Sequence, residues 1–176
     1  MKAHFELLAG YNQSMNEQLY HAASMLDAEQ LGEDRGAFFG SVSGTLNHLL
    51  VGDIIWLKRF AEHPVGFASL EPVLTFPSPA ALSEILFSDF TELHRVRMVL
   101  DTIIQSFALE AREEDYAVAL AYNNTKGKAF VKPFGFLVQH LFNHQTHHRG
   151  QISTLLSQSG VDPGVTDLLM LIPDAD

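Results

Sequence analysis

Residues 140–151, HLFNHQTHHRGQ, hold four of the nine histidines of the chain. Each residue of an α-helix advances about 100°, so His140, His144, His147 and His148 fall within an arc of roughly 100°. Two imidazoles four residues apart can reach one metal ion. The pairs His140/His144 and His144/His148 both meet this test, so spacing alone does not choose between them. A zinc site needs three or four protein ligands, and in a helical bundle the next one projects inward from a facing helix.

The best candidate for that third ligand is His48, within the run TLNHLLVGDIIWL at residues 45–57. It lies inside an apolar helical pattern rather than at a solvated helix end. Gly52 follows one turn later and would leave room beside the imidazole, at a cost of ~1 kcal/mol against alanine in a helix. Trp56, a further turn along, could form the apolar wall of a pocket. Three histidines from two helices therefore predict a metal site.

Four long amphipathic patterns predict an all-α, four-helix bundle in a single domain over residues 1–176. The helices are expected at about 4–26, from Ser41 or Ser43 to 61, at 78–109 with Ser78 as N-cap and Pro79 in the first turn, and from Pro133 to just before Gly160. The turn-rich segment NNTKG at 123–127 separates two strand-like runs and predicts a short β-hairpin or irregular arm. The tail at 166–176 is expected to pack one apolar turn onto the body.

Composition excludes several classes of function. The chain has no cysteine, so disulfides, cysteine zinc sites and cysteine nucleophiles are excluded. The net charge of −10 and the absence of a basic cluster argue against nucleic-acid binding. No apolar run approaches the ~20 residues that cross a bilayer, and no secretory signal is visible, so we expect a cytoplasmic protein without a membrane partner. Motifs of di-iron bundles, zincins, serine hydrolases and nucleotide-binding loops are also missing.

Taken together, LNHLLVGDIIWL, HLFNHQTHHRGQ and the hairpin segment AYNNTKGK resemble the DinB family of DinB/YfiT-like metalloenzymes over essentially the whole chain. The resemblance implies an up-down-down-up helix connection and a homodimer. It also implies one divalent metal, zinc or nickel, held by His48, His144 and His148 with water in the open positions. His140 and His147 would then be supporting or surface residues.

The resemblance further implies a reaction. Relatives include enzymes that use low-molecular-weight thiols, so the metal would bind an external thiol as thiolate and direct it at an electrophile of a small-molecule substrate, in an S-transferase type of activity. A metal-dependent hydrolase that activates water is the alternative. A third possibility is a non-catalytic dimeric bundle that binds metal or a small ligand in a stress response.

Other residues around the motifs receive narrower expectations. Three could support the site as hydrogen-bonding or lining groups, namely Asn47, Asn143 and Tyr122. Asp53 lies about 140° round the helix from His48 and is expected to point elsewhere. Arg149 is expected in a surface or dimer salt bridge, and Gly150 at a close helix contact, such as a dimer seam.

Overall fold

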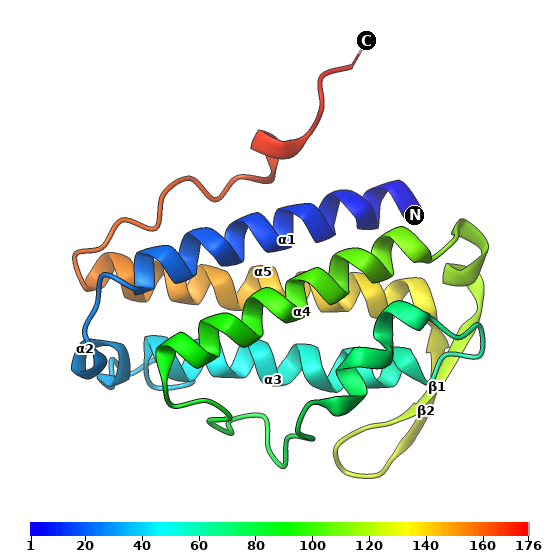
Figure 1. The fold of residues 1–176 in the computed structure, drawn as a ribbon, viewed down its shortest axis with the longest axis horizontal. Coiled ribbons are helices and arrows are strands. Elements are labelled where there is room, and N and C mark those ends of the chain that lie inside the picture. Colours follow the sequence, from blue (N-terminus) through cyan, green and yellow to red (C-terminus); the bar gives the residue numbers. More distant parts are fainter. Residues whose placement is uncertain (176) are drawn as a thin grey trace.

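The computed structural model describes residues 1–175 and consists mainly of four long helices, which confirms the predicted fold class (Figure 1). These are α1 (Lys2–Ala23), α3 (Val42–Ala61), α4 (Phe90–Glu110) and α5 (Phe134–Gln158). The shorter elements are α2 (Ala28–Gly32), the 3₁₀ turns η1 (Ala68–Thr75), η2 (Glu113–Ala117) and η3 (Leu168–Leu171), and a hairpin of β1 (Ala119–Asn123) and β2 (Ala129–Pro133).

The helices are connected in the up-down-down-up order. Figure 1 shows that α1 and α5 run in one direction and that α3 and α4 run in the other. Helix α1 packs against α4 and α5, and α3 packs against α5, η1 and α4. Because α3 and α4 are parallel, the chain must return along the bundle between them, and residues 62–89 make this crossing. Because α3 packs against α5, the two helices that carry the histidine motifs are direct neighbours.

The core forms because each long helix turns an apolar face inward, at the three- and four-residue spacing of the sequence pattern. At the hairpin end of the bundle it consists of aromatic rings that stack or meet edge to face, and these are Phe60, Phe67, Phe107, Tyr116 and Phe134. All five are buried. None of the helices within residues 1–175 is long and apolar enough to span a membrane.

The start of α4 differs from the prediction. The helix begins at Phe90, where the Asp89 side chain caps it by accepting a hydrogen bond from the Glu92 backbone N–H (2.8 Å), and residues 78–89 form turns and bends. Two apolar residues that made this segment look helical, Leu82 and Ile85, are 50% and 51% exposed. The segment therefore lacks the buried face that would have favoured a helix.

The predicted hairpin before α5 is confirmed. Its strands are antiparallel, with Tyr122 opposite Phe130 and Asn123 opposite Ala129. At the tip, the Asn124 side chain accepts hydrogen bonds from the backbone N–H groups of Lys126 and Lys128. This turn brings residues 124 and 125 to a pocket that side chains of α3 and α5 also line.

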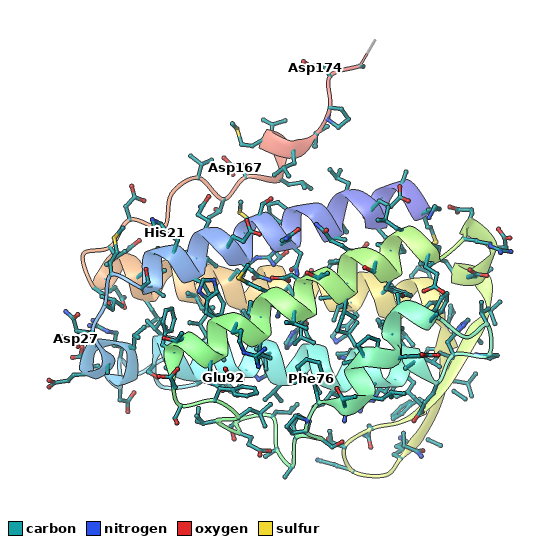
Figure 2. All side chains as sticks on the ribbon, viewed as in Figure 1. His21, Asp27, Phe76, Glu92, Asp167 and Asp174 are labelled. Atoms are coloured by element: carbon teal, nitrogen blue, oxygen red, sulfur yellow. The ribbon has the colours of Figure 1, made fainter. Side chains whose placement is uncertain are left out.

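The C-terminal tail packs less closely than predicted. The apolar turn exists as η3 and lies near α1, and the Tyr11 hydroxyl donates to the Thr166 carbonyl (2.6 Å). However, Leu169 and Met170 are 73% and 72% exposed. Figure 2 shows that the tail, with Asp167 and Asp174 labelled, lies outside the four-helix body.

Candidate metal centre

Three histidines from α3 and α5 come together between the two helices. The Nε2 atom of His48 lies 3.0 Å from Nε2 of His144 and 3.1 Å from Nε2 of His148. His48 and His148 are buried and His144 is half-buried. Within residues 1–175, this is the group of histidine and carboxylate side chains whose ligand atoms are close enough to hold one metal ion.

The spacing of these nitrogens suits a small divalent cation. Zinc lies 2.0–2.1 Å from each histidine nitrogen in tetrahedral sites, which places two such nitrogens about 3.3 Å apart. Imidazole is a ligand for zinc, nickel, copper and iron, whereas magnesium and calcium prefer oxygen. The donor set therefore fits a transition metal with three protein ligands and at least one further position for another ligand.

Hydrogen bonds on the far side of two rings set their tautomers. Nδ1 of His48 donates to the Leu82 carbonyl (2.8 Å), because a carbonyl can only accept. Nδ1 of His148 lies 2.8 Å from Oε1 of Gln151, which accepts in the same way. In neutral rings both Nε2 atoms then carry lone pairs, and these lone pairs face each other at 3.1 Å. Such lone pairs repel unless a cation lies between them, and partners of this kind orient the histidines of metal sites.

The electrostatics keep these rings neutral. Burial lowers the pKa of His48, His144 and His148 below the ordinary value of a histidine. The effect is largest for His144, where burial and the neighbouring imidazoles lower the pKa to about 3. Its Nδ1 is buried and has no hydrogen-bond partner among the described residues. Neutral imidazoles are the form that binds metal, so near neutral pH no proton has to leave.

Two glycines make room for the cluster. A Cβ atom at Gly52 would lie 2.7 Å from Cε1 of His144, so only glycine lets this imidazole reach His48. A Cβ atom at Gly44 would overlap the carbonyl of Phe39 in the loop before α3. Phe39 stacks on His48 with 3.7 Å between ring centroids and so covers one face of that imidazole. No sequence pattern indicated Phe39, because it lies in a glycine-containing loop.

A cavity of about 250 Å³ opens beside the histidines. It is lined by His48, Gly52, Trp56, Arg59, His140 and His144, and residues 124 and 125 of the hairpin also contribute to its wall. Trp56 therefore forms the apolar wall that the sequence predicted. The cavity is large enough for a small organic molecule that reaches the histidines.

The other predicted site residues lie around the cluster. His140 contacts the edge of Trp56 (5.0 Å between centroids), and His147 is exposed next to His148. Tyr122 reaches Trp56 from the hairpin (5.4 Å). Asn143 is exposed and makes no side-chain hydrogen bond within residues 1–175.

Asn47 supports the site through a loop. Its amide donates to the Phe87 carbonyl (3.0 Å), and its Oδ1 accepts from the Phe87 N–H (3.0 Å). These bonds hold the segment whose Leu82 carbonyl accepts the hydrogen bond from His48.

Asp53 points away from the cluster, as predicted, but into a buried polar network. Its carboxylate pairs with Arg97 of α4 (2.6 Å) and accepts from Gln145 of α5. Asp101 pairs with the same guanidinium (2.9 Å). The four long helices are joined here, since Asn12 of α1 donates to Asp101 (3.0 Å).

The expectations for Arg149 and Gly150 need correction. Arg149 is buried, lies over the ring of Tyr11 and donates to Asn12, so it is part of the interior rather than of a surface salt bridge. A Cβ atom at Gly150 would meet nothing within 4 Å in the described chain, so this glycine makes no close helix contact there. A dimer seam at Gly150 stays a prediction.

Known proteins resemble this chain over most of its length. The model of a family described as the DinB family matches residues 1–174. The chain is similar to Protein DinB of Bacillus subtilis (strain 168), with 24% identity over 161 residues that cover 89% of this chain and 87% of that protein. No solved structure matches it.

Proposed function

The chain belongs to the DinB family, and from this membership and the geometry of the three histidines we propose that it is a metal-dependent enzyme. His48, His144 and His148 would hold one divalent metal, zinc or nickel, through their Nε2 atoms. The reaction we propose is transfer of an external low-molecular-weight thiol to an electrophilic small molecule.

One observation carries this proposal. The unprotonated Nε2 atoms of His48 and His148 face each other at 3.1 Å, with Nδ1 of each ring already donating elsewhere. A neutral pair in this arrangement has no proton to share, and burial disfavours adding one. A metal ion would remove the repulsion and use all three lone pairs.

The residues of the chain have distinct parts in this function. A divalent metal with three imidazole ligands and an open position acts as a Lewis acid, which lowers the pKa of a bound thiol or water. Leu82 and Gln151 orient the ligand rings, and Phe39 covers one face of His48. The pocket beside Trp56 would hold the substrate next to the open position. The thiol must come from outside, because the chain has no cysteine.

Hydrolysis is the second candidate, since the same site could activate water. Both reactions need room for an organic molecule beside the metal, and the cavity of about 250 Å³ provides that room for either one.

The first experiment is elemental analysis of tag-free protein beside its His144→Ala variant. We expect close to one equivalent of zinc or nickel in the wild type and its loss in the variant, with unchanged helical circular dichroism. A His147→Ala variant is the matched control, because this exposed imidazole lies on the same helix outside the cluster. Wild-type protein that neither contains nor takes up zinc or nickel would refute the metal site. Thiol consumption with an electrophile, absent in His144→Ala, then separates transfer from hydrolysis.

A further inference from the structure

The pocket beside the histidines holds a cation whose hydrogen-bonding capacity is unused. The guanidinium of Arg59 lies 4.7 Å from the centroid of the Trp56 ring and 5.0 Å from that of Tyr122. Two aromatic faces, one from α3 and one from the hairpin, therefore hold the flat group in place. Contacts of this kind stabilise a guanidinium without using its N–H donors.

These donors have no partner among the described residues. Arg59 makes no ion pair and no side-chain hydrogen bond in residues 1–175. It is not paired even with Glu62, the acidic residue nearest to it in the sequence. Arg95 and Arg97, by contrast, are each paired with a carboxylate. Because Arg59 lines the same cavity as His144, its free N–H groups are available to a molecule bound there.

Partial burial makes this unpaired cation a binding group. Burial lowers the pKa of Arg59, while Tyr122 and Glu62 raise it. A guanidinium nevertheless stays charged at every pH at which the protein is folded. Its charge is also felt at His140, whose pKa is lowered by burial and by Arg59. A half-buried positive charge on an apolar wall binds an anion more strongly than an exposed one, because less water competes.

We propose that Arg59 is an anion-binding subsite that recognises a carboxylate at the far end of the thiol or substrate whose other end reaches the three histidines. This inference rests on the proposed function for the reacting end of the molecule. The backbone of Arg59 lies seven residues, or two helical turns, beyond that of Gly52, about 10 Å along α3, and its guanidinium lies over the ring of Trp56, about one turn nearer to the histidines. The ligand is therefore an extended molecule with a carboxylate separated from its metal-binding group by several bonds. The planar fork of Arg59 matches a carboxylate in a bidentate arrangement.

The test uses the one tryptophan of the chain, Trp56, whose fluorescence reports ligand binding beside Arg59 without any need for turnover. The probes are hexanoate and hexanol with metal-free protein, and mercaptohexanoate and mercaptohexanol with zinc-loaded protein. Each pair has the same chain length and differs in the charged end. We expect wild-type protein to bind each carboxylate about tenfold more tightly than its alcohol, since a carboxylate adds an opposite charge and a second, parallel hydrogen bond to the guanidinium, which a hydroxyl cannot supply.

The variant Arg59→Met should lose this preference, so that acid and alcohol bind within about twofold of each other, while Arg59→Lys keeps part of it. Arg95→Met is the matched control, because Arg95 pairs with Glu92 on the exposed face of α4, and it should behave like the wild type. A merely structural role for Arg59 would weaken acid and alcohol equally, and that result would overturn the proposal. An equal affinity of wild-type protein for acid and alcohol would overturn it as well.

The failure of this subsite can be distinguished from the failure of the proposed function. Zinc content measured in Arg59→Met should equal that of the wild type, because Arg59 is not one of the three clustered ligands. If wild-type protein binds no metal but still prefers hexanoate over hexanol, the metal site fails and the anion subsite stands. If zinc-loaded protein binds both thiols equally, the metal site stands and the anion subsite fails.

Discussion

The imidazole of His144 in α5 fills the space that a side chain at Gly52 of α3 would need. A Cβ atom at position 52 would be 2.7 Å from Cε1 of His144. The variant Gly52→Ala should therefore lose metal affinity by about tenfold or more, the range known for disturbed support of metal ligands. Metal-free Gly52→Ala should keep its helical content, because alanine favours a helix by ~1 kcal/mol over glycine.

Competition of each protein with a chelator measures this difference. Gly10→Ala in α1 is the control, because a Cβ atom there would meet nothing within 4 Å, and its metal affinity should equal that of the wild type. An unchanged affinity in Gly52→Ala would mean that His144 is not a ligand in the position described.

The hydrogen bond between Gln151 and His148 predicts a second effect on metal binding. Gln151→Ala should weaken zinc binding by about 10- to 100-fold, because Nδ1 of His148 loses the acceptor that orients the ring. Gln151→Glu should restore the affinity, since a carboxylate accepts the same hydrogen bond. Gln158→Ala, at the exposed end of the same helix, serves as the control. Equal affinities across the three variants would show that the hydrogen bond has no role in the site.

The buried network predicts a large loss of stability when its central cation is removed. Arg97→Met leaves the carboxylates of Asp53 and Asp101 without a counter-charge, and breaking a buried pair in this way costs about 3–5 kcal/mol. Urea unfolding followed by circular dichroism measures the change. Arg95→Met, which removes an exposed ion pair on the same helix, should leave the unfolding midpoint almost unchanged. If Arg97→Met lost as little stability as Arg95→Met, the two buried carboxylates would have to take up protons or water without an energetic penalty.

His63 predicts a pH dependence that is independent of the metal site. This buried imidazole stacks on Phe67 and Phe134, and burial lowers its pKa. In the unfolded chain it protonates near pH 6.5, so below that pH the unfolded state binds the additional proton. The contribution of His63 to stability is therefore present above about pH 6.5 and is lost as the pH falls.

The variant His63→Phe isolates this effect, because it keeps an aromatic ring and cannot be protonated. Unfolding free energies of the two metal-free proteins should be compared on either side of the ordinary histidine pKa, at about pH 7.5 and about pH 5.5. The unfolding free energy of the wild type, relative to that of His63→Phe, should be smaller at the lower pH than at the higher one. A constant difference would mean that His63 takes up a proton equally well in both states.

The sequence predicted the four helices and placed three histidines on facing elements, because apolar periodicity and ligand spacing are local properties. It failed at residues 78–89. Ser78 and Pro79 form a plausible helix start, but the amide of Asn47 satisfies the backbone of Phe87 from another helix. In a continuous helix the Leu82 carbonyl would accept from the N–H four residues later, whereas here it accepts from His48. A long-range interaction therefore overrides a local signal.

The buried charges were also beyond sequence reasoning. The local sequence around Arg97 and Arg149 does not distinguish them from surface arginines, since their partners come from helices far away in the chain. Asp53 and Asp101 lie 48 positions apart in the sequence, yet both pair with one guanidinium. Charged residues are seldom fully buried, so the default expectation places them at the surface. Only the packed bundle shows that they face one another.

The position of the three histidines along the chain has a consequence for biosynthesis. His48 leaves the ribosome with the second long helix, and the two remaining imidazoles follow on the last one, 96 and 100 residues later. At translation rates of roughly 5–20 residues per second, His144 and His148 are synthesised about 5–20 s after His48. A nascent chain therefore cannot complete the three-histidine site until α5 has docked, and capture of the ion would mark the end of folding rather than its beginning.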